Sequence, residues 1–514
     1  MPRQPNIVLI MADQLAPQFT GAYDHPLVKT PHMEALVKRG MRFDAAYCNA
    51  PLCAPSRFSF MSGQLVTRIA AYDNASEFPA SIPTFAHYLR VMGYRTCLSG
   101  KMHFVGPDQL HGFDERITTD VYPSDYAWTP DWELPDERID KWYHNMDSVR
   151  EAGVGQATFQ LDYDEEVAFA AKRRIFDFAR YEQEPFCLVA SFIHPHDPYV
   201  ARPEWWNLYE SDEIDMPKHV FDAKDQDGFS KRLMDGIEAS TVAVTEEEVR
   251  DSRHAYYANT SYFDSKVGEL VQTLEEAGLL ESTIVIVTAD HGDMLGERGL
   301  WYKMNFFEHS ARVPMIMAGP GVANGTAANA CSLVDILPTM LDIAAVDGHE
   351  IPEYGQPIDG RSLFPLARGD EDETDEAIGE YCAEMTSHPV FMIRRGKYKY
   401  IHCDVDQPLL YDLENDPDEL NNLASDPQHT EIAGAFAKEV SQRWNSEEIR
   451  EQVIATQKQR RAVHAAMQEG QRIDWDYNPP RDASQEYVRN HMDWTVAAAK
   501  TRFPPLDGGN EGRS

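Results

Sequence analysis

Acidic and imidazole side chains directly follow two apolar segments of the chain that we predict to be strands. Asp13 follows the first segment, and Asp290 and His291 follow a later one. Carboxylates brought together at one edge of a sheet would repel each other unless a cation lay between them. Asp290 could instead cap a helix, a position that Asp favours. Together with Cys53, the set favours a divalent metal site, where the ion would polarise a bound oxygen and lower the pKa of a bound hydroxyl group.

Several basic and imidazole side chains could supply positive charge to an anionic substrate. They are Arg57, Lys101, His103, His196 and Lys303. Lys101 and His103 follow a predicted strand two residues apart, so they would face the same way if the chain is extended there. Either one alone is typical of a solvated surface. The guanidinium of Arg57 is suited to bidentate contacts with oxyanions, so the set predicts an anion pocket beside the metal.

The segment from residue 122 to residue 144 interleaves aromatic and acidic side chains. Its aromatic and imidazole residues are Tyr122, Tyr126, Trp128, Trp132, Trp142, Tyr143 and His144, and its acidic residues are Asp125, Asp131, Glu133, Asp136 and Glu137. One interpretation is a capping loop whose rings pack on the core. The other is a cage for a quaternary ammonium group, because cations over Trp and Tyr faces gain about 0.5–2 kcal/mol each. Trp128 and His144 are the candidates for such contacts.

Apolar, β-branched segments must position these side chains. We predict strands at Ile7 to Ala12, Tyr94 to Ser99, Phe186 to Phe192 and Thr283 to Ala289. They alternate with helix-like segments, which predicts an α/β fold with a mixed, mostly parallel central sheet covered by helices on both faces. Ligands bind beyond the carboxyl ends of the strands in such sheets, so the polar residues that follow each strand should meet at one edge.

The pattern changes near residue 380. We predict a smaller antiparallel sheet from Ile378 to Ala383, Val390 to Arg394, Lys397 to His402 and Leu410 to Leu413, with a hairpin turn at Arg395 and Gly396. The expected division is a catalytic α/β domain (residues 1–375), an antiparallel-sheet subdomain (376–447), and a helix with a C-terminal tail (448–514).

A charged helix is predicted from Ile449 to Met467, followed by an aromatic, proline-bearing tail from Trp475 to Pro505. Such a tail should dock against protein, so we expect a contact within a homo-oligomer, a dimer or tetramer. Residues 507–514 are Gly-rich and predicted to be disordered.

Composition excludes several classes of protein. A formal net charge of −37 over 514 residues argues against nucleic-acid binding and disfavours anionic membranes. The acidic surface indicates either solubility alone or a cytoplasm of high ionic strength. Seven scattered cysteines predict reduced thiols and a cytoplasmic protein. We find no membrane span, and interpret the first apolar segment as a strand, not a signal peptide.

Motifs along nearly the whole chain resemble the sulfatases of the alkaline phosphatase superfamily. They are Asn6 to Asp13, the C-x-P-S-R signature from Cys53 to Arg57, Gly100 to His103, His194 to Pro198, Thr288 to Gly292 and Leu410 to Pro417. The segments Arg481 to Ala483 and Tyr487 to Thr495 resemble the C-terminal extension of the choline sulfatases. The resemblance implies an alkaline-phosphatase-like fold and hydrolysis of choline sulfate to choline and sulfate.

For the reaction, the resemblance implies that Cys53 is oxidised to formylglycine by dedicated machinery and that its hydrate attacks sulfur. Cys53, Asp13, Asp290 and His291 would bind the metal, and the five basic or imidazole side chains named above would hold sulfate. One imidazole, His103 or His196, would protonate the leaving alkoxide and the other would accept the proton that releases sulfate.

For substrate binding, Asn74 would add a donor beside the sulfate. Trp128 and His144, together with Glu380 or Glu384, would hold the ammonium end. Glu384 is favoured by its position at a strand end. Asp493 of a neighbouring subunit's tail would complete the site.

Two departures from the broad sulfatase pattern affect the metal. Gln14 follows Asp13 where many members carry a second acid, and His291 replaces Asn. A nitrogen ligand makes calcium less secure and manganese plausible. The nearest alternative function is a phosphonate monoester or phosphodiester hydrolase. If Cys53 is unmodified, the alternative is a non-catalytic protein that binds quaternary amines. If the protein is a choline sulfatase, the choline that it releases could feed glycine betaine synthesis and osmoprotection.

Overall fold

The computed structural model describes residues 4–134, 144–182, 184–346 and 348–469. Its main sheet has eight strands in the order β10-β2-β9-β8-β1-β6-β3-β4. The strands are β1 (Asn6–Asp13), β2 (Gly40–Tyr47), β3 (Arg95–Gly100), β4 (Glu115–Arg116), β6 (Phe186–Pro195), β8 (Thr283–Ala289), β9 (Met315–Ala318) and β10 (Gly325–Ser332). β9 runs antiparallel to β2 and β8, whereas the other pairings are parallel, so the predicted mostly parallel sheet is confirmed.

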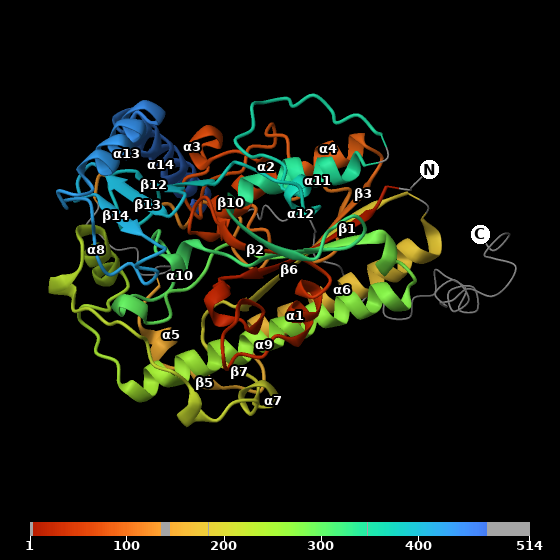
Figure 1. The fold of residues 1–514 in the computed structure, drawn as a ribbon, viewed down its shortest axis with the longest axis horizontal. Helices are drawn as coiled ribbons and strands as arrows, with labels where there is room; N and C mark the ends of the chain where they lie inside the picture. The colour runs from red at the N-terminus through yellow and green to blue at the C-terminus, as the bar shows by residue number, and fades with distance from the viewer. Residues whose placement is uncertain (1–3, 135–143, 183, 347, 470–514) are drawn as a thin grey trace, which may run out of the picture.

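Helices cover both faces of this sheet, which explains why β1, β6 and β8 are apolar and fully buried. In Figure 1, α6, α9 and α1 lie along one face, and α2, α4 and α11 lie along the other. Their bounds are α1 (Pro31–Val37), α2 (Cys53–Ser62), α4 (Phe85–Val91), α6 (Phe159–Tyr181), α9 (Glu246–Glu276) and α11 (Ile336–Ala344).

Short elements join these layers. The helices are α3 (Val66–Ile69), α5 (Asp147–Arg150), α7 (Pro203–Trp206), α8 (Gly228–Gly236), α10 (Glu308–Ala311) and α12 (Phe364–Ala367). Single 3-10 turns lie at Pro17–Phe19, Gly21–Tyr23, Ser211–Glu213, Ala223–Asp225, Leu280–Ser282, Glu297–Gly299 and Leu333–Asp335. β5 (Gly153–Val154) and β7 (Val200–Ala201) form a separate parallel pair.

The second sheet is antiparallel, as predicted, and has the order β11-β12-β13-β14. Its strands are β11 (Glu376–Tyr381), β12 (Val390–Arg395), β13 (Tyr398–Cys403) and β14 (Leu409–Asp412). Gly396 makes the hairpin turn with a φ of +57°. α13 (Thr430–Arg443) and α14 (Ser446–Gln468) contribute apolar side chains to the same core cluster as this sheet.

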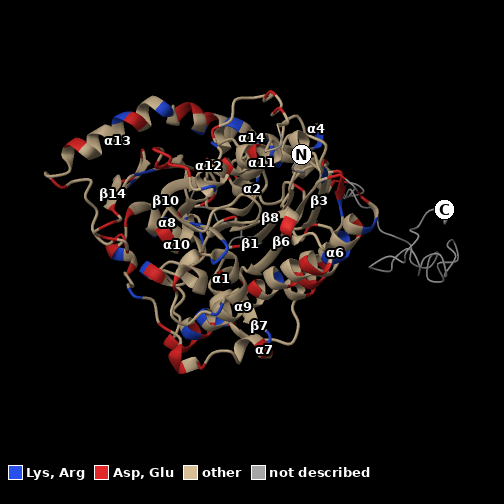
Figure 2. Cartoon of the chain, turned by 45° about the vertical axis from the view of Figure 1, so that its right-hand side comes forward, with Lys and Arg blue, Asp and Glu red and all other residues tan. Residues whose placement is uncertain are grey.

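Figure 2 shows that acidic positions are spread over the outer helices, including α6 and α13. All seven cysteines lie in the described ranges, and each is buried and unpaired, as predicted. Within those ranges, no helix combines the length and apolar character needed to cross a bilayer. Asp493, the tail from Trp475 to Pro505, Trp142 and Tyr143 lie outside the described residues.

Candidate active site

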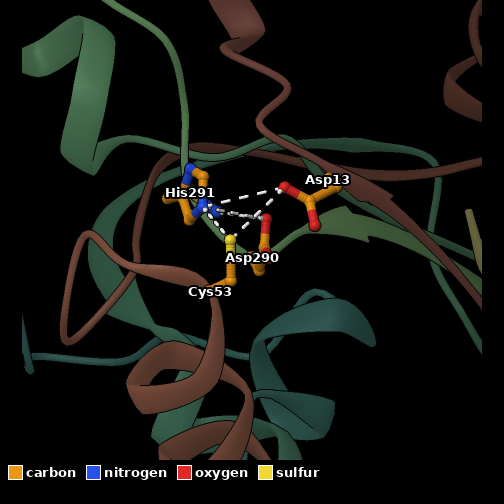
Figure 3. Close-up of side chains that lie close together, drawn as sticks. All are labelled: Asp13, Cys53, Asp290 and His291. Atoms are coloured by element: carbon orange, nitrogen blue, oxygen red, sulfur yellow. Dashed lines mark hydrogen bonds and ion pairs between the residues drawn. The ribbon is translucent and has the colours of Figure 1, made fainter. Parts of the chain in front are cut away.

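The four predicted metal ligands lie close together, three at the ends of paired strands and Cys53 at the start of α2 (Figure 3). Asp13 ends β1, and Asp290 and His291 follow β8, the strand paired with β1. The Nε2 atom of His291 lies 3.8 Å from Asp13 Oδ1 and 3.7 Å from Asp290 Oδ1. The Sγ atom of Cys53 lies 3.3 Å from His291 Nε2 and 3.8 Å from Asp13 Oδ1. The four ligand atoms lie within 4.8 Å of one another, close enough to hold one metal ion.

Cys53 is placed by the first turn of α2. The Ser56 hydroxyl donates to the Asp290 backbone oxygen at 2.5 Å, and Asn74 Oδ1 accepts the Ala54 N–H at 3.0 Å. These bonds tie the start of the helix to the strand end beneath it and to the loop that carries Asn74. Burial, followed by the charge of Asp13, raises the pKa of the Cys53 thiol to about 12. The thiol is therefore protonated at neutral pH and, unmodified, would be a poor nucleophile.

Arg57, one turn further along α2, bridges both carboxylates from a fully buried position. Its Nε lies 2.8 Å from Asp290 Oδ2, and its Nη2 lies 3.1 Å from Asp13 Oδ2. Its Nη1 donates to the Lys101 backbone oxygen at 2.7 Å and to the Ser191 hydroxyl at 2.8 Å. These bonds occupy most of its donors. They place Arg57 behind the carboxylates, where it offsets their mutual repulsion, and the sulfate contact expected from the sequence stays a prediction.

Lys101 enters the site because β3 ends in a glycine. Gly100 has a φ of +108°, and a Cβ there would lie 1.9 Å from the Ser191 backbone oxygen. The chain therefore turns inward, and the Lys101 ammonium pairs with Asp13 and lies 4.2 Å from the centre of the Tyr122 ring. Burial alone would raise the pKa of Asp13, but Lys101 and the other nearby cations outweigh it and hold that pKa well below its usual range.

His103 reaches the site through a turn and not through the extended chain that its spacing predicted, because its φ is +59°. Its backbone N–H donates to Asp120 at 2.8 Å, and its ring lies 4.9 Å from that of Tyr122. Neither ring nitrogen has a hydrogen-bond partner among the described residues. Burial and the charge of Lys101 lower the pKa of His103 to about 3. A neutral imidazole with two unpaired nitrogens can bind a ligand, and a bound anion would raise its pKa.

His196 and Lys303 contact each other close to Asp13, whose Oδ1 lies 4.0 Å from His196 Nε2. Lys303 Nζ lies 2.8 Å from His196 Nε2 and donates to Gln14 Oε1 at 2.5 Å. Burial and the charge of Lys303 hold the pKa of His196 well below its usual value. His194 turns away and bonds to Asp164 on α6, with 2.6 Å between Nδ1 and Oδ2. Of the two histidines that β6 delivers, only His196 faces the site.

Gln14 and Asp197 belong to the site although the sequence analysis gave neither a role. Gln14 Nε2 donates to Asp293 Oδ2 at 2.7 Å and to Asp197 Oδ1 at 3.3 Å. Asp197 Oδ1 also lies 3.2 Å from His196 Nδ1. Each is adjacent in sequence to a predicted site residue, but adjacency does not indicate whether a side chain points into the site.

The aromatic segment divides between the two interpretations. The Trp128 ring lies 5.2 Å from Tyr122 and 5.9 Å from His103, so it borders the site. His144 stacks on Tyr302 at 4.4 Å, and its ring lies 5.7 Å from that of His196. Trp132, in contrast, is buried in the core and donates its indole N–H to the Ala383 oxygen at 2.7 Å. The segment thus packs on the core at Trp132 and faces the site at Trp128.

The two candidate glutamates differ in their surroundings. Glu380, on β11, accepts bonds from the Thr67 N–H at 2.9 Å, the Thr67 hydroxyl at 3.0 Å and the Trp444 indole at 2.6 Å. Glu384 lies beyond the strand, and its Oε2 atom is buried with no partner among the described residues. Burial raises the pKa of Glu384 to about 7, although the positive charge of Lys303 acts to lower it. Glu384 is therefore the better candidate to meet a cation.

Family comparisons agree with this geometry. The profile described as "Sulfatase" matches residues 5–346, "Choline sulfatase enzyme C terminal" matches residues 451–503, and "N-sulphoglucosamine sulphohydrolase, C-terminal" matches residues 296–446. The solved phosphonate monoester hydrolase of Agrobacterium radiobacter has a TM-score of 0.69 at 23% identity, over 87% of this chain and 96% of that one. This likeness confirms the predicted alkaline-phosphatase-like fold.

Sequence relatives extend the agreement to the whole chain. The choline-sulfatase of Rhizobium meliloti (strain 1021) is 47% identical over 509 residues, which cover 98% of this chain and 99% of that protein. Arylsulfatase K of Danio rerio is 30% identical over 446 residues, 82% of this chain and 80% of that protein. With the catalytic profile, the C-terminal profile and a full-length relative in agreement, the chain belongs to the sulfatase family, the enzymes that hydrolyse sulfuric esters, and to its choline-sulfatase branch.

Proposed function

We propose that the protein hydrolyses choline sulfate to choline and inorganic sulfate, with formylglycine formed from Cys53 as the nucleophilic residue. The observation that carries the reaction is the position of Cys53 Sγ, which lies within 4.8 Å of the candidate ligand atoms of Asp13, Asp290 and His291. The choline end is supported by the full-length choline-sulfatase relative and by the buried Oε2 atom of Glu384, which has no hydrogen-bond partner among the described residues.

The donor set fits a divalent metal ion, because Asp13, Asp290 and His291 offer two carboxylates and one imidazole to one point. When bound, the ion would polarise a sulfate oxygen and lower the pKa of the nucleophilic hydroxyl group. The imidazole favours manganese over calcium, which prefers shells made of oxygen only.

The remaining side chains bind the anion and move protons. Lys101 and Lys303 would offer ammonium groups to the sulfate, and Arg57 keeps the two ligand carboxylates in place. His103 and His196 are the candidates to protonate the leaving choline oxygen and to accept the proton that lets sulfate leave. The trimethylammonium group would bind against the aromatic face of Trp128 and the negative charge of Glu384.

Mass spectrometry of the Cys53 peptide, followed by choline sulfate turnover on the same sample, tests the proposal. A mass loss of about 18 Da at Cys53, the cysteine-to-formylglycine change, together with released sulfate is the expected result. Cys53→Ala should show neither. If formylglycine is present but a phosphodiester is turned over faster than choline sulfate, the phosphodiester becomes the proposed substrate. If Cys53 is unmodified and the protein is inactive, the result supports a quaternary-amine binder.

We also propose a cytoplasmic setting, supported by seven buried unpaired thiols. A homo-oligomer through the tail would bring Asp493 of one subunit to the site of another. Choline release for glycine betaine synthesis would fit the acidic composition. The division into residues 1–375, 376–447 and 448–514 is part of the same proposal.

A further inference from the structure

One turn of α14 contacts a segment more than 300 residues earlier in the chain. We call residues 126–134, which include Trp128 and Trp132, the pocket wall. The contacts from α14 to the pocket wall are Gln457 Oε1 to Trp132 N–H at 2.9 Å, Lys458 Nζ to Glu133 Oε1 at 2.8 Å, Arg460 Nη1 to Thr129 Oγ1 at 3.4 Å, and Arg461 Nη1 to the Pro130 oxygen and to Asp131 Oδ2, both at 2.9 Å.

Two of these α14 residues are buried and the most constrained. Gln457 and Arg460 are 1% and 7% exposed, and they lie three residues apart on one face of the helix. Arg460 also forms a bidentate pair with the fully buried Asp73, with distances of 2.5 and 2.7 Å. Buried bidentate pairs fix geometry strongly, and removal of one partner leaves an uncompensated charge. Asp73 directly precedes Asn74, whose side chain bonds to the Ala54 N–H at the start of α2.

The pocket wall is held from its other side by the segment that carries Glu384. The Trp132 indole donates to the Ala383 oxygen, one residue before Glu384. At its other end the wall presents Trp128 beside His103 and Tyr122. A loop held at both sides loses little further entropy when a ligand binds, so these bonds preorganise the segment that carries Trp128 and link it to the segment that carries Glu384.

We propose that Gln457 and Arg460 are positioning residues that determine selectivity for the choline end of the substrate. They act by holding the pocket wall, and thus Trp128, in register with Glu384. This inference rests on the proposed function, because it concerns recognition of the trimethylammonium group. The choline-sulfatase C-terminal profile matches residues 451–503, a range that begins within α14. The proposal gives α14 a role within its own subunit.

The test compares choline sulfate with ethyl sulfate, which keeps the alkyl ester and lacks the trimethylammonium group. The variants are Gln457→Leu, Arg460→Met and the conservative Arg460→Lys. Gln459→Leu is the matched control, because it makes the same substitution at an exposed position on the same helix. For each variant, kcat and KM are measured on both esters, and the ratio of the two kcat/KM values reports selectivity.

We expect the selectivity ratio to fall about tenfold in Gln457→Leu and Arg460→Met, mainly through a higher KM for choline sulfate. Arg460→Lys should recover part of the ratio, and Gln459→Leu should keep it within about twofold. Loss of folded protein lowers the apparent kcat on both esters equally and leaves the ratio unchanged, so poor folding cannot imitate the effect.

An unchanged ratio in both Gln457→Leu and Arg460→Met, or an equal fall in Gln459→Leu, would overturn the inference. A wild-type enzyme that cleaves ethyl sulfate as well as choline sulfate would instead overturn the proposed substrate, and the inference with it. The wild-type measurement alone separates these two failures.

Discussion

Replacement of Glu384 by Gln should remove a pH-dependent part of choline recognition. The substitution keeps the shape of the side chain and deletes a buried charge whose Oε2 atom has no partner among the described residues. Burial raises the pKa of this carboxyl to about 7. A group with that pKa is about 10% ionised at pH 6 and about 90% ionised at pH 8. Attraction for a cation should therefore be present above pH 7 and lost as the pH falls below it, a change of about tenfold.

The assay is kcat/KM between pH 6 and pH 8 on choline sulfate and on 3,3-dimethylbutyl sulfate, in which carbon replaces the charged nitrogen. Because kcat/KM reports the ionisation of the free enzyme, groups that act on the sulfate end affect both esters equally. The ratio of the two values should rise about tenfold from pH 6 to pH 8 in the wild type. In Glu384→Gln it should stay flat at the low-pH level.

Glu380→Gln is the matched control, since it makes the same change at a carboxylate already bonded to Thr67 and Trp444. Its ratio should retain the wild-type pH dependence. A flat ratio in the wild type, or a steep one in Glu384→Gln, would refute the assignment of the cation contact to Glu384.

Three further predictions concern the reacting end of the site. If His103 or His196 is the general acid, its Ala variant should slow choline sulfate by about 10²–10⁴-fold but slow an aryl sulfate with a good leaving group far less; equal losses on both esters would mean that the residue only binds sulfate. His291→Asn should shift the metal preference from manganese toward calcium by roughly tenfold in competitive metal loading measured by elemental analysis, and an unchanged ratio would count against His291 as a ligand. Arg57→Met should lower the free energy of unfolding by about 3–5 kcal/mol in a denaturant titration, because it removes the buried cation that is paired with Asp290 and one of those paired with Asp13; a loss below about 1 kcal/mol would contradict its bridging role.

Three of the four candidate metal ligands, Asp13, Asp290 and His291, could be predicted because they lie at the ends of buried parallel strands. Such strands are continuous apolar segments, and the polar residue after each one stands at the ligand-binding edge. Asp13 and Asp290 therefore emerged from the sequence with their partners. Strands β9, only four residues long, and β10, made mainly of small residues, lack that signal and were not predicted.

The directions in which side chains point could not be predicted from the sequence. All ten residues of α2 are buried, so no polar face indicated that Arg57 would point at the carboxylates. Lys303 lies in the long connection after β8, and only the folded chain brings it to His196. The pairing of Arg460 with Asp73 joins residues 387 positions apart, a separation at which one sequence carries no contact information.

The burial of Cys53 bears on when its proposed oxidation can take place. In the folded protein this residue is 1% exposed, and its cover includes His291 and the bond from the Met304 N–H to the Pro51 oxygen. These covering residues leave the ribosome roughly 250 residues after Cys53, which at about 5–20 residues per second is about 12–50 seconds later. During this interval these residues cannot cover the thiol, so the oxidation proposed for Cys53 has at least this time to take place on an accessible side chain.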